Sequence, residues 1–285
     1  MRPEFRFNDV DIICTRNSLR KLLDFCGGRA LQSFRVNLSK VHDTLFIEQY
    51  DTTNMAYQHT GWGHSFEQTF TTFPRGLEAS IAHDRFLRYP IGDLNCVVGF
   101  EVDACYEQKS DEADCADQGP LETLQSSMDK FALEVPTEDS EDTSGGASVS
   151  DPPNQITEAK IMPQSPAAEI KSKAKRTGIN GFLPQVWFGR TPWLIMGTHA
   201  EGTFHDIKIT NAAAHFERWE TEHQVELRKM ATVLAELREA VRSNGDRGCA
   251  AIYEKDPNGS RVIQVFPLAN GKTTLSGEVI REFWA

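Results

Sequence analysis

Two acidic side chains stand close together in a stretch that otherwise has the character of a buried strand. In VVGFEVDACYE, residues 97–107, only Val102 separates Glu101 from Asp103. Alternate residues of an extended strand lie on the same face of a sheet. The spacing therefore predicts two carboxylates on one face and Val102 in apolar packing on the other.

A second motif further along the chain repeats this pattern. In AEIKSK, Glu169 and Lys171 flank Ile170, so two polar side chains again share one face of an expected strand. If this strand pairs with the first as an antiparallel neighbour, three carboxylates and a lysine converge on one surface. The long segment between the motifs then becomes a loop, because the cost of closing a loop rises only slowly with its length.

A surface of this kind has a chemical use. Carboxylates held close together repel one another unless a cation lies among them. Oxygen ligands without His or Cys favour Mg²⁺ or Mn²⁺ over zinc. Such an ion can activate water for attack at phosphorus, and a neighbouring lysine can orient that water or stabilise the negative transition state. Each motif alone is also compatible with charges that keep a strand edge soluble.

Helices and strands are expected to follow one another irregularly around the motifs. A helix is expected at residues 18–26, with Ser18 as its N-cap. The other expected helices begin at Gly63 and cover residues 181–189 and 211–244. The expected strands lie at 34–51, within 88–105, around 169–171, and at 191–200, 203–210, 248–255 and 261–267. Without regular βαβ alternation, this mixture predicts an α/β (α+β) fold with a central mixed β-sheet flanked by helices.

The net charge of −11 is concentrated in one segment. Residues 107–142 contain twelve acidic residues and two lysines, a net charge of −10, and Ser, Gly and Pro are frequent in the residues that follow. Such a segment cannot bury enough apolar surface to order itself. We therefore predict one domain formed by residues 1–106 and 166–285, with a disordered acidic insertion at 107–165. The charge of the whole chain then says little about the folded surface.

The cysteines and the apolar segments indicate the compartment. The six cysteines include no CxxC pair and no zinc-ligand spacing. The N-terminus lacks the apolar core of a signal peptide, and no apolar run approaches the ~18 residues of a membrane span. We expect a protein of the nucleus or cytoplasm with no membrane partner.

With these motifs in order, the chain resembles the DXO-type decapping nuclease family, and in particular its fungal branch. These are RNA 5′-end quality-control enzymes with a PD-(D/E)XK-nuclease-like core. The matching segments are SFRVNLSK with Arg35, GWGHSFEQ with Gly63 and Glu67, GFEVDA with Glu101 and Asp103, AEIKSK with Glu169 and Lys171, and LPQVWFGRTPWLIMGTHAEGTF with Gln185. In the second segment His64 stands where that family usually has an aromatic residue. The likeness spans roughly residues 20–285 apart from the insertion.

The resemblance implies a role for each matched residue. The implied metal ligands are Glu67, Glu101, Asp103, Glu169 and the main chain of Ile170. Arg35 would contact a substrate phosphate, and Lys171 and Gln185 would face the scissile phosphate or its water. The implied catalytic set is Glu101, Asp103, Glu169, Lys171 and Gln185, with Mg²⁺ or Mn²⁺ as the cofactor.

The activity implied by the resemblance is hydrolysis at RNA 5′ ends. It comprises removal of defective or noncanonical caps, release of pyrophosphate from triphosphorylated RNA and, in some members, 5′→3′ exonuclease action. The implied partners are an RNA 5′ end and a 5′→3′ exoribonuclease. The alternative is an inactive nuclease-fold protein that binds RNA 5′ ends or such an exonuclease. The short segment ahead of Arg35 favours this alternative, and the complete set of acids argues against it.

Overall fold

The structure is a computed structural model that describes residues 6–50, 61–73, 80, 82–107, 162–245, 247–256, 261–268 and 275–284. The chain divides into two units, one formed by Met1–Tyr106 with Pro163–Ala285 and the other by Glu107–Met162. The first unit contains every element described below. Apart from its two ends, the predicted acidic insertion lies outside the described residues, and its disorder stays a prediction.

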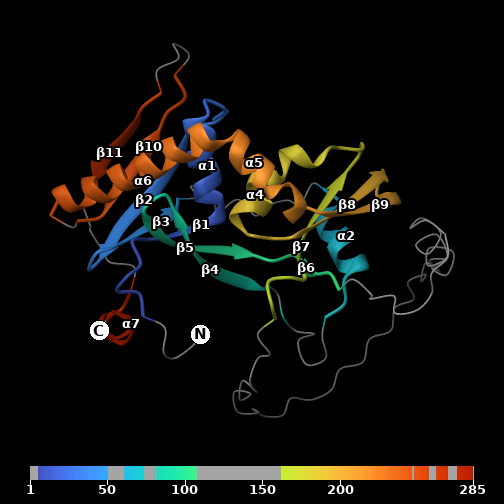
Figure 1. Ribbon diagram of the computed structural model, residues 1–285, viewed down its shortest axis with the longest axis horizontal. Coiled ribbons are helices and arrows are strands. Elements are labelled where there is room, and N and C mark those ends of the chain that lie inside the picture. Colours follow the sequence, from blue (N-terminus) through green and yellow to red (C-terminus); the bar gives the residue numbers. More distant parts are fainter. Residues whose placement is uncertain are drawn as a thin grey trace, which may run out of the picture. The chain divides into compact units, whose positions relative to one another are not determined.

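Seven of the described strands form the larger sheet (Figure 1). Their order is β11-β10-β2-β3-β1-β5-β4, and β1 runs parallel to both β3 and β5 while the other pairs are antiparallel. The bounds are β1 Ile12–Thr15, β2 Phe34–Val41, β3 Thr44–Gln49, β4 Asp84–Ile91, β5 Leu94–Glu101, β10 Cys249–Tyr253 and β11 Ile263–Pro267. The mixed sheet predicted from the sequence is confirmed.

Four further strands form a smaller sheet in the order β6-β7-β8-β9. Here β7 and β8 are parallel, and the other two pairs are antiparallel. The bounds are β6 Ala104–Cys105, β7 Ala167–Lys173, β8 Trp193–Ala200 and β9 Thr203–Asn211. Only Val102 and Asp103 separate β5 from β6, so the chain passes from one sheet to the other at the Glu–Val–Asp motif.

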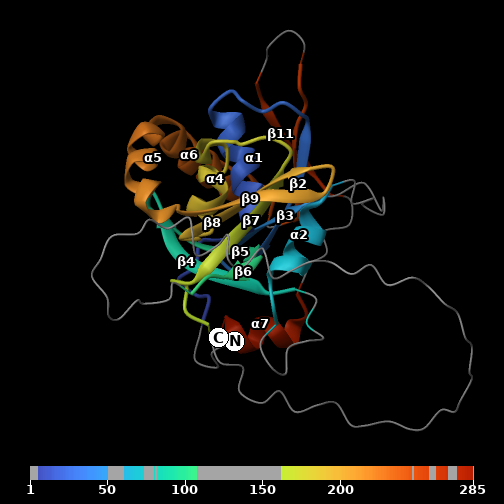
Figure 2. The ribbon, with the colours of Figure 1, turned by 90° about the vertical axis from the view of Figure 1, so that its right-hand side faces the viewer.

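Helices cover the sheets on more than one side (Figures 1 and 2). The helices α1, α4, α5 and α6 pack against one another, with α1 on β1, β3 and β5 and α6 on β2. Helix α2 packs on β7, and Trp284, directly after α7, reaches Phe46 on the other face of β3. The bounds are α1 Arg16–Cys26, α2 Gly63–Phe70, α4 Leu183–Phe188, α5 Phe216–Glu222, α6 Gln224–Ser243, α7 Gly277–Phe283 and the 3₁₀ turns Ile179–Gly181 and Ala213–His215.

Helix α1 begins two residues earlier than the sequence pattern predicts. Thr15, not Ser18, is the N-cap, and its hydroxyl accepts a hydrogen bond from the Ser18 N–H. The apolar face, which includes Leu19 and Leu22, is buried in the core, and the helix ends before Gly28, whose φ is +71°. The earlier start places Arg16 within the first turn of the helix.

Two further expectations need correction. The helix predicted over 211–244 is divided, because His223 leaves helical geometry and its ring stacks on Trp219. The residues before β5, for which the sequence pattern predicts no separate strand, form β4, an edge strand paired with β5. Its polar and apolar residues alternate only weakly, and Pro90 within it is tolerated because the strand lies at an edge. No described helix has the length and apolar character that a membrane crossing requires.

Candidate active site

The Glu–Val–Asp motif meets β7 through the short strand β6. Ala104 pairs with Ala168, so one step along this register Asp103 lies opposite Glu169. The Ile170 N–H donates to Asp103 Oδ2 at 2.8 Å. Val102 is buried, as predicted. The predicted antiparallel pairing therefore exists, but β6 makes it, while β5 itself belongs to the larger sheet.

Glu169 is the centre of the site. Its side chain is 1% exposed, and its Oε2 accepts a hydrogen bond from Arg16 Nη1 at 2.7 Å. Its Oε1 accepts hydrogen bonds from Lys171 Nζ and from Gln185 Nε2. A buried carboxylate is stable only when it is paired and hydrogen-bonded. Helix α1, strand β7 and helix α4 each supply one of these donors, so Glu169 ties three distant segments together.

Lys171 links the two acidic motifs. Its Nζ contacts Glu169 Oε1 and lies 3.7 Å from Asp103 Oδ2. The lysine side chain is 26% exposed, whereas that of Asp103 is 15% exposed. The structure thus brings Asp103, Glu169, Lys171 and Gln185 together, and the Ile170 main chain belongs to the same cluster.

Burial and mutual repulsion shift the pKa values of the carboxyl groups in this cluster. Burial raises the pKa of Asp103 to about 7, and the nearby Glu169 carboxylate adds to this shift. Lys171 and the Ile170 N–H partly oppose it. Burial also raises the pKa of Glu67, on α2, while Lys171 lowers it and Glu101 and Glu169 raise it further. Glu67 therefore interacts electrostatically with the same cluster, and Glu101 interacts with Glu67.

Not every expected site residue lies in direct contact with Glu169. Glu101 ends β5 opposite Asp84, with its side chain exposed. Arg35 lies in β2, where its Nε donates to Asn37 Oδ1 at 3.1 Å and its guanidinium lies 3.8 Å from the centre of the Tyr50 ring. The predicted phosphate contact of Arg35 therefore stays a prediction.

Two arginines of α1 belong to the site and were not predicted. Arg16 binds Glu169, and its guanidinium also lies 5.1 Å from the centre of the Phe100 ring. One turn later, Arg20 Nη1 donates to Gln185 Oε1 at 3.2 Å. Residues four apart share one face of a helix, but the helix predicted from the sequence begins at residue 18, so this spacing gave no signal for Arg16.

The donor chemistry of the cluster fits a hard divalent cation. Glu67, Glu101, Asp103 and Glu169 offer only oxygen, as does the Ile170 carbonyl, and oxygen ligands suit Mg²⁺ or Mn²⁺. Burial first, and the neighbouring Glu169 carboxylate second, raise the pKa of Asp103, and a cation bound beside both carboxylates would oppose this shift. Within the described ranges, however, no three acidic, His or Cys side chains already form a metal-ligand group. Lys171 and Gln185 occupy Glu169 Oε1 instead.

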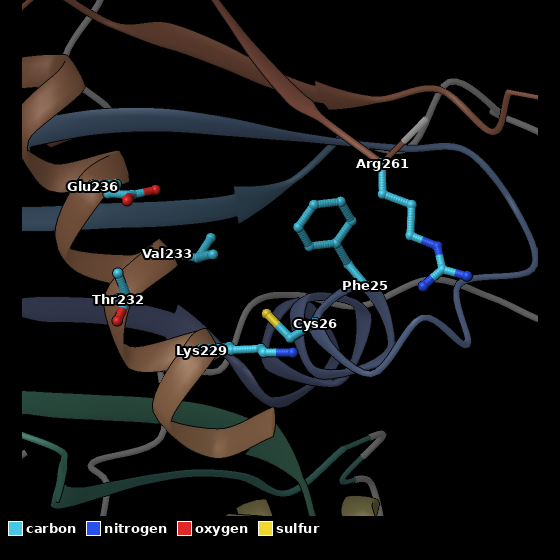
Figure 3. Close-up of a pocket in the computed structure, with 7 residues that line it drawn as sticks. All are labelled: Phe25, Cys26, Lys229, Thr232, Val233, Glu236 and Arg261. Atoms are coloured by element: carbon cyan, nitrogen blue, oxygen red, sulfur yellow. The ribbon is translucent and has the colours of Figure 1, made fainter. Parts of the chain in front are cut away.

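A pocket lies elsewhere in the same unit. It has a volume of about 360 Å³ and is formed by the last residues of α1, by α6 and by Arg261 (Figure 3). Its lining residues are Phe25, Cys26, Lys229, Thr232, Val233, Glu236 and Arg261. None of them belongs to the acidic cluster.

Comparison with known proteins gives a family and a fold. The family model described as "Domain of unknown function (DUF8563)" matches residues 1–284. No curated protein matches.

Solved structures of Rai1 and Dxo1 proteins are similar to this chain. S. pombe Rai1 in complex with 3′-FADP is 12% identical, with a TM-score of 0.56, over 91% of this chain and 72% of that one. Scheffersomyces stipitis Rai1 with (3′-NADP)⁺ and calcium is 13% identical, with a TM-score of 0.56, over 96% of this chain and 68% of that one. Candida albicans Rai1 with pU5–Mn²⁺ is 12% identical, with a TM-score of 0.53, over 96% and 71%. The resemblance noted from the motifs is thus confirmed at the level of the fold.

Proposed function

The chain belongs to the family described as Domain of unknown function (DUF8563), and we propose that it is a divalent-metal-dependent hydrolase of RNA 5′ ends. The observation that carries the proposal is the buried Glu169 carboxylate, which gathers Arg16, Lys171 and Gln185 beside Asp103. The fold supports it, because similar Rai1 structures contain 3′-FADP, calcium or pU5–Mn²⁺.

The metal would be Mg²⁺ or Mn²⁺. Glu67, Glu101, Asp103, Glu169 and the Ile170 carbonyl would hold it. When bound, such an ion activates water and stabilises the charge that develops at phosphorus. The shared position of Lys171 between Asp103 and Glu169 gives the protein a means of holding these carboxylates together before the ion binds.

The side chains around Glu169 would act on the substrate. Lys171 would donate to a nonbridging phosphate oxygen or orient the attacking water, and the Gln185 amide would fix the same group from α4. Arg16 would offer its remaining N–H donors to the phosphate. The oxygen of the attacking water would form the new bond to phosphorus. The bond between this phosphorus and the oxygen of the leaving phosphate, nucleotide or cap would break.

The finer assignment follows the resemblance. We propose removal of defective or noncanonical caps or of pyrophosphate, with 5′→3′ exonuclease action as a further activity of the same site. Arg35 is the proposed additional phosphate contact. A 5′→3′ exoribonuclease is the proposed protein partner, and the nucleus or cytoplasm the proposed compartment.

A second candidate function is binding without hydrolysis. The observation that favours it is the absence, among the described residues, of a ready-made group of three metal-ligating side chains. In that case Lys171 would permanently neutralise Glu169 and Asp103, and the site would only recognise a 5′ phosphate.

The two candidates are separated by one assay. The protein, the Glu101→Ala/Asp103→Ala variant and the exposed α6 control Glu236→Ala are incubated with 5′-triphosphate, unmethylated-cap and NAD-capped RNA, with Mn²⁺ or with EDTA. We expect Mn²⁺-dependent release from at least one RNA by the protein and the control, and none by the double variant. Absence of release from all three, together with no Mn²⁺ binding by calorimetry, would refute the hydrolase.

A further inference from the structure

Arg16 and Arg20 lie one turn apart on α1 but have different partners. Arg16 is neutralised by the buried Glu169 carboxylate and rests against the Phe100 ring. Among the described residues, the half-buried Arg20 has one hydrogen-bond acceptor, the neutral amide oxygen of Gln185, at 3.2 Å. In the part of the chain that the structure describes, no carboxylate oxygen lies within 4.0 Å of its guanidinium.

The surroundings of Arg20 disfavour its positive charge. Burial lowers its pKa, and the Arg16 guanidinium lowers it further, while Asp24 and Glu169 only partly compensate. Two neighbouring guanidinium groups are stabilised when an anion lies between or beside them. The partner that Arg20 lacks is therefore an anion.

The position of Arg20 indicates which anion this is. Gln185 accepts from Arg20 and donates to Glu169, so the Arg20 guanidinium lies two hydrogen bonds away from the centre of the site. A guanidinium has five N–H donors in a planar fork that matches phosphate oxygens. One of the five is used by Gln185, which leaves the others for a group next to the proposed scissile phosphate.

We propose that Arg20 binds a second phosphate group of the RNA 5′ end, adjacent to the phosphorus that is attacked. The ligand class is thus a phosphoanhydride, as in a 5′-triphosphate or a cap, and Arg20 makes the site select it over a 5′-monophosphate. This inference rests on the proposed function and adds a residue that distinguishes a 5′-triphosphate from a 5′-monophosphate.

The test measures binding as a function of phosphate number. Short RNAs of one sequence, labelled at the 3′ end and carrying a 5′-triphosphate, 5′-monophosphate or 5′-hydroxyl, are titrated with the full chain in Ca²⁺ and followed by fluorescence anisotropy. A gel confirms that the RNAs remain intact. The variants are Arg20→Gln, Arg20→Lys and the control Arg29→Gln, an exposed arginine just after α1 that pairs with Asp24 and Glu226.

The expected result is a loss that is specific to the triphosphate. Arg20→Gln should weaken triphosphate binding by about 10-fold and leave the other two RNAs within about 2-fold, because one charge-assisted contact is removed. Arg20→Lys should keep part of the preference, and Arg29→Gln all of it. Urea unfolding checks that each variant is folded. If Arg20→Gln does not fold, the inference is tested with Arg20→Lys alone.

Three other outcomes have distinct meanings. Equal weakening of all three RNAs by both Arg20 variants would show that Arg20 only positions Gln185, and would overturn the inference. An unchanged preference in the variants would overturn it as well, with the proposed function intact. If the unmodified protein itself does not distinguish the three RNAs, recognition of the 5′ end fails, and the proposed function fails with the inference.

Discussion

The two ends of α1 differ in kind. Its first half carries Arg16 and Arg20 into a cluster of buried charges, where every polar group of Glu169 has a partner. Its last residues, Phe25 and Cys26, line a pocket of about 360 Å³ (Figure 3). The first region is a network of paired, largely buried charged groups, and the second is a pocket whose charged residues are exposed.

The two regions differ in the solvent exposure of their charged side chains. The charged residues at the pocket, Lys229, Glu236 and Arg261, are exposed, so solvent screens them and their interactions are weak. In the cluster, burial shifts the pKa of Asp103 to about 7. A protein that keeps such a group in its interior incurs a cost in stability, and costs of this kind concentrate at functional sites.

The largest expected difference between the regions is the response to loss of one carboxylate. Glu169→Gln leaves Arg16 and Lys171 without their buried anion. We expect the free energy of unfolding to fall by about 3 kcal/mol and hydrolysis to fall at least about 100-fold. Glu236→Gln, at the pocket, should change stability by less than about 0.5 kcal/mol and leave activity unchanged. Urea unfolding and the RNA 5′-end assay measure both.

Equal effects of these two substitutions would contradict the comparison. A loss of activity in Glu169→Gln without any loss of stability would also be informative, because it would mean that Arg16 and Lys171 find other partners or solvent. The buried network would then contribute to function but not to the fold.

The second prediction concerns pH. In the unfolded chain Asp103 loses its proton near pH 3.8, whereas in the folded protein its pKa is about 7. Between these values the unfolded state is deprotonated and the folded state is not, so this group makes stability fall as pH rises from about 4 to about 7. Asp103→Asn should therefore be more stable than the unmodified protein at pH 8, by about 2–4 kcal/mol in EDTA, and nearly equal to it at pH 4.5.

Manganese should reverse this ordering. Metal binding needs the deprotonated carboxylate, so Mn²⁺ should stabilise the unmodified protein more at pH 8 than at pH 5.5 and Asp103→Asn much less. The measurement is urea unfolding at the three pH values with EDTA or Mn²⁺. A stability difference that does not change with pH would show that Asp103 keeps an ordinary pKa in the fold.

The core of the site could be predicted from the sequence because it depends on local spacing. A period of two places Glu169 and Lys171 on one face of β7, and antiparallel pairing brings Asp103 beside them. The mixed sheet and the helices around it follow from patterns of similar length. The sequence could not predict that β6 makes this pairing, because a strand of two residues is too short to show an alternation of polar and apolar residues.

The arginines were missed for a different reason. Arg16 meets Glu169 across 153 residues of chain, and only the packing of α1 against β1 and β5 makes this contact. No local rule distinguishes an arginine that is buried by tertiary packing from one in solvent. Arg35 was chosen because its segment matches a family motif, and a match in sequence does not by itself place a side chain.

A smaller effect tests whether Arg16 or Arg35 contributes to hydrolysis at the cluster. Arg16→Gln removes the cation from Glu169 Oε2, and we expect hydrolysis to fall by about 10- to 100-fold. Arg35→Gln removes the contacts with Asn37 and Tyr50 in β2. If Arg35 binds phosphate, its loss should raise KM several-fold with little change in kcat.

The kinetic comparison of these two variants decides between the assignments. A larger loss of kcat in Arg35→Gln than in Arg16→Gln would place the reacting phosphate near β2 and would contradict the site built around Glu169.

The smallest expected effect lies at the pocket end of α1. Burial raises the pKa of Cys26 to about 11, with Lys229 only partly opposing the shift. Because the thiolate is the reactive form, iodoacetamide at pH 7.5 should modify Cys26 more slowly than the exposed Cys105, as measured by peptide mass spectrometry. Cys26→Ala should leave hydrolysis and RNA binding unchanged. Rapid modification of Cys26 that also inhibits hydrolysis would link the pocket to the cluster through α1, and the two ends of the helix would then be one functional unit.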